Sequence, residues 1–375
     1  MSRSREKTMN NFSKLNKNIN KPICIVVALL ALLSVTMIGS KTVSSGFVTK
    51  SVIVQSAAFI IGTIAVIVLL NYNYTMFRGK EKMLYIASVV CLLLVYVPGL
   101  GVERYGARSW INLVIIDFQP SELVKIFYIL ILAGYFEKHQ DELYNFRCLI
   151  KAGLVAAPII LIVLKEDLGS ALVFATIWLL MLIVAGIDGK TFAKFLAIVI
   201  AIMPVTYVFM ANHQKDRIEA FLHPDNLALP ANYQVWQSKI AIGSGGFFGK
   251  GLFKGTQKEL DFIPVQTSDF IFSIIGEELG FVGGLAVIVM YGILLFEMMK
   301  TASRSKDLYG SLIVVGVVGM FIFQIFENIA MTMGIMPVTG VTLPFLSYGG
   351  SSVVSNMLAL AMVLNVGVRN SRLNF

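Results

Sequence analysis

The sequence predicts an all-α polytopic membrane protein with about ten transmembrane helices. Of its 375 residues, 57% are hydrophobic and only 14% are charged, and the mean hydropathy is +0.77. A soluble domain keeps about a quarter of its residues charged. Apolar runs of about 17–25 residues recur along the chain, whereas transmembrane β-strands would give short alternating segments. Composition and run length together therefore predict a bundle of membrane-spanning helices.

Each apolar run is taken as one helix. In order, the predicted helices lie near 22–40, 52–71, 83–98, 120–136, 148–164, 169–187, 191–211, 269–298, 308–330 and 351–368. The first run is too long for a signal peptide and lacks a clear A-x-A cleavage site, so it is expected to be an uncleaved anchor. The cysteines are isolated within or beside these runs and predict neither a disulfide nor a metal site: Cys24, Cys91 and Cys148.

The net charge of +9 is distributed unevenly among the connections. Lys and Arg gather in the N-terminal tail and in alternate connections. The other short connections hold few: Lys41, Lys50, Arg104, Arg108 and Lys165. This positive-inside bias predicts that both termini are cytoplasmic, and it argues against a nucleic-acid partner. The chain is thus expected to divide into a basic cytoplasmic tail (1–21), one transmembrane domain (22–368) and a short cytoplasmic tail (369–375).

The connection between the seventh and eighth predicted helices, residues 212–268, is much longer than the others. This topology places it outside the membrane as a large extracytoplasmic loop. Connections of this length are usually functional or disordered, and this one is too apolar for simple disorder. Apolar residues share helical faces in two places, Ile218 with Phe221 and Tyr233 with Trp236. The pattern predicts short amphipathic helices on the membrane surface.

Within this loop, residues 241–257 read AIGSGGFFGKGLFKGTQ, which suggests a phosphate cradle. A nucleotide-binding P-loop needs Ser or Thr after the Gly-Lys pair, but Gly251 follows Lys250, so no nucleotide is expected. Two interpretations remain open. The stretch is either a flexible turn or an anion site for a lipid head group or lipid-linked phosphate. The polar residues that favour an anion site are Gln237, Ser238, Lys239, Lys250, Lys254, Thr256 and Gln257.

Several ionisable residues lie in or beside the apolar runs, where charge is costly. Three of them have an ordinary structural explanation: Asp269 can cap a helix, and Glu122 with Lys125 can form an i, i+3 salt bridge. Together they predict a hydrophilic pocket at the outer face. The residues concerned are Glu122, Lys125, Asp167, Asp269, Glu277, Glu278 and Glu327. His139, His213 and His223 are interpreted as solvated loop residues.

Five long motifs resemble the SEDS family (shape, elongation, division and sporulation), and the RodA branch most closely. They are GARSWINLVIIDFQPSELVK (106–125), DLGSAL (167–172), YQVWQSKIAIGSGGFFGKGLFKGTQ (233–257), SDFIFSIIGEELGFVG (268–283) and MPVTGVTLPFLSYGGSS (336–352). The family commonly reads P-E-x-H-T-D where this chain reads PVQTSD, residues 264–269. The final Asp is kept, and the Glu and His are not.

The resemblance implies a glycosyltransferase of the bacterial cytoplasmic membrane that polymerises lipid II into peptidoglycan strands on the outer face. It releases undecaprenyl diphosphate and serves elongation, division or sporulation. The implied partners are a class B penicillin-binding protein and other proteins of the elongation or division complex. Asp269 matches the family's essential acid. A divalent cation, Mg²⁺ or Mn²⁺, is a candidate cofactor.

In the predicted mechanism, Asp269 is the general base. Cations stabilise the departing diphosphate, and Asp167 and Glu122 orient those cations or bind a metal. The candidate cations are Arg108, Lys125, Lys239 and Lys250; Gln237, Ser238, Thr256 and Gln257 complete the expected substrate-binding set. Two other functions stay open: a lipid II flippase and a non-catalytic scaffold of the cell-wall synthesis complex.

Overall fold

A computed structural model describes residues 19–41, 46–104, 107–112, 117–143, 145–256 and 262–370. Most of the predicted N-terminal tail and residues 371–375 of the predicted C-terminal tail lie outside these ranges, as does Gln257.

Every predicted apolar run contains a helix. These helices are α2 (Lys21–Lys41), α3 (Lys50–Leu70), α4 (Glu81–Leu93), α5 (Pro120–Lys138), α6 (Phe146–Glu166), α7 (Leu168–Val184), α8 (Gly189–Phe209), α12 (Ile271–Ser303), α13 (Leu308–Thr332) and α14 (Gly350–Asn370). Short 3₁₀ helices occur in the connections: η2 (Tyr74–Phe77), η3 (Leu94–Tyr96) and η4 (Gln140–Glu142).

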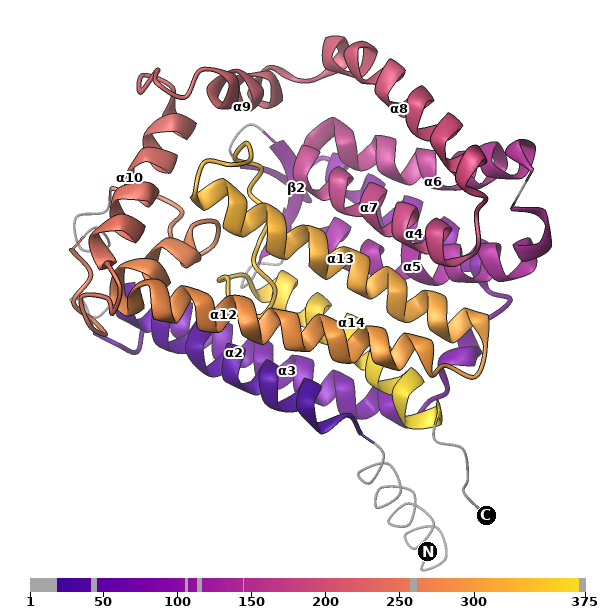
Figure 1. Cartoon of the computed structure of the whole chain (residues 1–375), viewed down its shortest axis with the longest axis horizontal. Helices are drawn as coiled ribbons and strands as arrows, with labels where there is room; N and C mark the ends of the chain where they lie inside the picture. The colour runs from indigo at the N-terminus through magenta and orange to yellow at the C-terminus, as the bar shows by residue number, and fades with distance from the viewer. Residues whose placement is uncertain are drawn as a thin grey trace, which may run out of the picture.

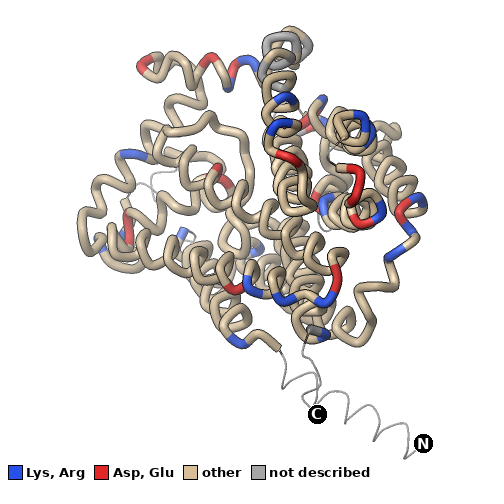
Figure 2. Tube along the Cα trace, turned by 45° about the vertical axis from the view of Figure 1, so that its right-hand side comes forward, with Lys and Arg blue, Asp and Glu red and all other residues tan. Residues whose placement is uncertain are grey.

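Within the described residues, 6 helices are long and apolar enough to cross a membrane by length and composition: α2, α3, α6, α12, α13 and α14. The shorter helix α7 is also apolar. Figure 2 shows long stretches of the helices without coloured charged residues. The chain is therefore a mainly helical, multi-pass membrane protein, and the full number of crossings stays a prediction.

The expectation of an all-α fold is wrong in the connection between α4 and α5. There the chain forms a 3-stranded antiparallel sheet of β1 (Gly101–Arg104), β2 (Ala107–Asn112) and β3 (Asp117–Phe118), in the order β1-β2-β3. Val102 pairs with Trp110, and Ile111 pairs with Phe118. Branched and aromatic residues at paired positions favour strands. Such short strands give no long periodic pattern in the sequence.

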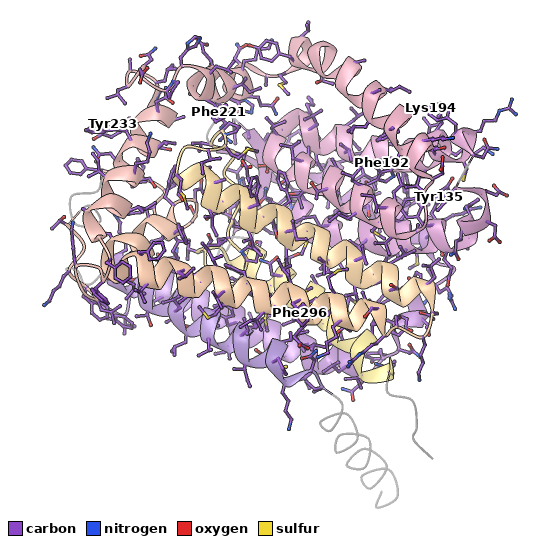
Figure 3. The ribbon with its side chains drawn as sticks, viewed as in Figure 1. Tyr135, Phe192, Lys194, Phe221, Tyr233 and Phe296 are labelled. Atoms are coloured by element: carbon purple, nitrogen blue, oxygen red, sulfur yellow. The ribbon has the colours of Figure 1, made fainter. Side chains whose placement is uncertain are left out.

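Helix α13 lies in the middle of the bundle and packs against α5, α7 and α12. Glycines allow its close approach: a Cβ atom at Gly316 would lie 2.7 Å from Ile129 of α5, and one at Gly319 would lie 3.2 Å from Leu180 of α7. Small residues at such contacts are typical of membrane helices. On the outside of the bundle, Phe296 of α12 points away from its neighbours (Figure 3).

The described residues of the long connection between α8 and α12 include the helices α9 (Asn212–Leu222) and α10 (Pro230–Gly245). Both lie away from the end of the bundle where α2 begins and α14 ends (Figure 1). Phe221 of α9 and Tyr233 of α10 are exposed (Figure 3), as the amphipathic pattern predicts. This arrangement gathers α9 and the segments before α12 and α14 around one cavity.

Candidate functional site

A cavity of about 570 Å³ contains Asp269. It is lined by the start of α3, by β2, by the junction of α6 and α7, by α9, and by the segments that precede α12 and α14. Segments that are distant in the sequence thus meet at one polar site.

Asp269 is half-buried and lies two residues before α12 begins. Its backbone N–H donates to the carbonyl of Val265 over 3.0 Å, and its own carbonyl accepts from Nδ2 of Asn328 over 2.9 Å. Burial raises the pKa of this carboxyl, and the negative charge of Asp167 raises it further; a hydrogen bond from Ser268 and the charge of Arg217 lower it. The balance is a raised pKa, which makes the deprotonated side chain a stronger base.

Asp167 is the second predicted acid in this cavity. It caps the start of α7: Oδ1 accepts from the backbone N–H of Ser170 over 3.0 Å, and Oδ2 accepts from its hydroxyl over 2.7 Å. Nε2 of Gln119 also donates to Oδ2, over 3.3 Å. These contacts hold Asp167 in one orientation facing the same space as Asp269.

Two cations that line the cavity are absent from the candidates predicted by sequence: Arg217 and Lys50. Nη1 of Arg217 donates to the carbonyl of Thr339 over 2.7 Å, which ties α9 to the segment before α14. Lys50 is exposed at the first residue of α3. One weak signal was available for Lys50, since it belongs to the few basic residues in the short outer connections.

His213 lies in helix α9 and not in a loop. The interpretation as a solvated loop residue is wrong, because His213 is half-buried in α9 and lines the cavity together with Arg217, four residues later. Residues four apart share one face of a helix. The apolar pattern of α9 gives no separate signal for these residues, because Phe221 follows Arg217 by four positions and shares its face.

The predicted cations of the membrane domain lie outside this cavity. Nζ of Lys125 is buried and donates to Oε1 of Glu122 over 2.7 Å, which is the ordinary i, i+3 salt bridge. Arg108 donates its backbone N–H to Oε2 of Glu166 over 2.8 Å and lines a separate, smaller cavity beside Asp167.

The candidate substrate-binding residues on α10 also lie outside the large cavity. The hydroxyl of Ser238 donates to the carbonyl of Thr332 over 2.8 Å, and Nε2 of Gln237 donates to the hydroxyl of Tyr233 over 3.1 Å. Lys239 lines a small cavity that shares Arg217 with the large one. A role for Lys239 beside the diphosphate stays a prediction.

The glycine-rich stretch packs on α12. Nζ of Lys250 lies 2.6 Å from Oε1 of the fully buried Glu277, and it donates to Oγ1 of Thr256 over 2.9 Å. Backbone hydrogen bonds run from Lys250 to the carbonyl of Glu277 and from Phe281 to that of Gly246. Gly249 has a φ of 80°, and a Cβ atom there would lie 2.1 Å from the carbonyl oxygen of Glu278. The glycines thus permit close backbone contact, and anion binding by this stretch stays a prediction.

Carboxylates for a divalent cation are present but sparse. In the described ranges, no group of three or more His, Cys, Asp or Glu side chains could hold a metal ion. A Mg²⁺ ion held mainly by substrate phosphates needs only one or two carboxylates, for which Asp167 and Asp269 are the candidates. The cation stays a prediction, and no catalytic step proposed for this site depends on it.

A family model described as "Cell cycle protein", for FtsW, RodA and SpoVE, matches residues 20–372. The chain is 37% identical over 308 residues to stage V sporulation protein E of Bacillus subtilis (strain 168), covering 82% of this chain and 84% of that protein. It is 33% identical over 314 residues to peptidoglycan glycosyltransferase MrdB of Escherichia coli (strain K12), covering 84% of each.

The fold is also found in a solved structure described as "Structural coordination of polymerization and crosslinking by a peptidoglycan synthase complex". The TM-score is 0.81 and the identity 29%, and the match covers 93% of this chain and 97% of the other. The family model and the solved structure each match nearly the whole length of this chain. The chain therefore belongs to the FtsW/RodA/SpoVE family, the SEDS proteins.

Proposed function

We propose that this chain is a peptidoglycan glycosyltransferase that joins lipid II units into glycan strands and releases undecaprenyl diphosphate. The observation that carries the proposal is the half-buried Asp269, which shares a cavity of about 570 Å³ with the cations Arg217 and Lys50. A base can activate the acceptor hydroxyl, and cations can stabilise the departing diphosphate, when a sugar is transferred from a diphosphate. The names of relatives such as MrdB support the same activity.

In this mechanism Asp269 removes the proton from the 4-hydroxyl of the acceptor GlcNAc. The hydroxyl oxygen forms a bond to C1 of the donor MurNAc, and the bond from C1 to the diphosphate oxygen breaks. General base catalysis of this kind contributes about 10²–10⁴ in rate. Burial supports the role, because it raises the pKa of Asp269.

The leaving diphosphate gains negative charge as the C1–O bond breaks. Arg217 is already oriented by its hydrogen bond to Thr339, so little reorganisation is needed when that charge develops. Lys50 supplies a second positive charge in the same cavity. An interaction that strengthens only in the transition state raises the turnover rate rather than substrate binding alone.

The cavity is proposed to face the outside of the bacterial cytoplasmic membrane, with both termini in the cytoplasm. The distribution of Lys and Arg supports this orientation. A class B penicillin-binding protein is the proposed partner, because the solved structure of similar fold belongs to a complex that polymerises and crosslinks peptidoglycan. Other proteins of the elongation or division complex are expected to bind this assembly.

The direct test is polymerisation of lipid II by the purified protein in detergent. Asp269→Asn should lower glycan synthesis by at least about 10²-fold while the thermal unfolding transition is kept. Asp225→Asn is the matched control, because Asp225 is exposed between α9 and α10 and does not line the cavity. Normal synthesis by Asp269→Asn would show that the assigned base is wrong.

The same assay separates the other two functions. A flippase has no membrane to act across in detergent, so polymer formation there demonstrates glycosyl transfer. A scaffold would instead support full synthesis by the partner complex even when Asp269 is replaced.

A further inference from the structure

The proposed mechanism leaves one cavity side chain unused, the imidazole of His213. This residue lines the cavity from α9 and is half-buried. Its Nε2 atom is buried and, among the described residues, has no hydrogen-bond partner. A buried polar atom without a partner costs about 1–3 kcal/mol, so its presence at a binding cavity suggests that a ligand completes it.

Hydrogen bonds on both sides of the cavity fix the position of α9. Nε2 of Gln214 donates to the carbonyl of Leu164 in α6 over 2.8 Å, and Arg217 reaches Thr339 on the other side. His213 directly precedes Gln214 in the sequence, and it shares the cavity face with Arg217. The imidazole is therefore presented from a held element rather than from a free loop.

The charges around the cavity indicate which part of a substrate would reach His213. The carboxylates that line it are Asp117, Glu166, Asp167 and Asp269, whereas its basic nitrogen groups are Lys50, His213 and Arg217. Phosphate oxygens are repelled by the first set and attracted by the second. Two of the three nitrogen groups, His213 and Arg217, come from α9.

We propose that Nε2–H of His213 donates a hydrogen bond to the diphosphate of the polyprenyl-linked donor, beside Arg217. This inference rests on the proposed function and specifies how the site recognises its anionic leaving group. The imidazole acts by hydrogen bonding to the substrate, and no proton is transferred in the step proposed. Because charge builds up on the diphosphate as it leaves, the contact assists both binding and reaction.

The test uses geranylgeranyl diphosphate as the probe and measures its binding to the purified full-length protein by calorimetry. His213→Ala should weaken binding of the diphosphate by about tenfold or more, the usual effect of losing a hydrogen bond to a charged group. Binding of geranylgeraniol, which lacks phosphate, should not change. His213→Gln should restore part of the affinity, because its amide can also donate.

His223→Ala is the matched control, since His223 ends the same helix but is exposed and does not line the cavity. It should bind the diphosphate as the unaltered protein does. Thermal unfolding of each variant identifies a loss caused by misfolding. If His213→Ala were misfolded, diphosphate binding by the folded His213→Gln variant would test the inference instead. That variant should show a smaller loss for the diphosphate and none for the alcohol.

Unchanged diphosphate binding by His213→Ala would overturn the inference, even if polymerisation fell. That result would assign His213 to a sugar hydroxyl or to the protein itself. The two proposals can fail separately. A protein that binds the diphosphate through His213 but forms no polymer from lipid II would contradict the proposed function and keep the inference.

Discussion

At the scale of single residues, Gly340 connects the proposed base with the proposed cation. It has a φ of 78°, and a Cβ atom built on it would lie 3.4 Å from Oδ2 of Asp269 and 3.9 Å from Nη1 of Arg217. A side chain there would enter the space between the two functional groups. The backbone conformation therefore favours glycine, and an added Cβ atom would lie in ordinary contact with both functional groups and take up space between them.

Gly340→Ala is expected to lose most of its polymerising activity. Its stability should fall by about 1–2 kcal/mol, because a residue with a Cβ atom is strained at positive φ. Gly186→Ala is the control, since Gly186 also has a positive φ, 102°, but a Cβ atom there would meet nothing within 4 Å. That variant should be destabilised and remain active. Full activity of Gly340→Ala in the lipid II assay would show that the space beside Asp269 is not needed.

At the scale of elements, the loop 246–256 and helix α12 form one unit. The helix carries two carboxylates with no exposed side-chain surface, Glu277 and Glu278, just before the non-helical backbone of Gly280. Lys250 and Thr256 bring donors to Glu277, and the backbone N–H of Phe253 donates to Oε2 of Glu278 over 3.1 Å. A helix with these acids would be costly to bury without the loop.

Lys250→Ala is accordingly expected to destabilise the protein by up to about 3 kcal/mol, the lower end for a broken buried ion pair, because Thr256 still donates to Glu277. The fraction that stays folded should polymerise lipid II at the normal rate, because Lys250 does not line the large cavity. Unfolding is measured by thermal denaturation in detergent, and turnover is normalised to folded protein.

Lys254→Ala in the same loop is the control, since Lys254 is exposed. The double variant Lys250→Met with Glu277→Gln should recover part of the stability, because no buried charge is left without its partner. A normal unfolding transition of Lys250→Ala combined with slow turnover would instead favour the predicted anion site in this stretch.

At the scale of the whole molecule, the beginning of α2 and the end of α14 lie at one end of the bundle, away from α9 and α10 (Figure 1). If the bundle axis runs across the membrane, this arrangement predicts an even number of crossings. The alternation of basic connections between the apolar runs predicts the same result.

The orientation can be measured with single cysteines after Cys24, Cys91 and Cys148 are replaced by alanine. Asp225→Cys, between α9 and α10, should react with a membrane-impermeant maleimide in intact cells. Ser303→Cys, at the end of α12, should react only after the membrane is opened. Labelling of both positions from the same side would contradict the predicted topology.

Local sequence was enough to predict the apolar helices, the family and two of the four acids that line the cavity, Asp167 and Asp269. Long apolar runs specify membrane helices through their composition, and Asp167 and Asp269 lie in contiguous motifs that identify the SEDS proteins. The short sheet at 101–118 leaves no comparable signal in the sequence, because its strands depend on pairing with each other rather than on a long periodic pattern.

Tertiary packing, and not local sequence, selects the basic side chains that join those acids. Lys50, His213 and Arg217 come from α3 and α9 and meet Asp269 because distant helices pack around one cavity. The same packing places Lys250 against Glu277, although the glycine-rich stretch suggests a phosphate site when considered alone. Composition and periodicity are properties of residues that are close in the sequence, so they predict local structure. The partner of a charged side chain, by contrast, is set by elements that are far apart in the sequence, as Arg217 and Thr339 are, separated by 122 residues.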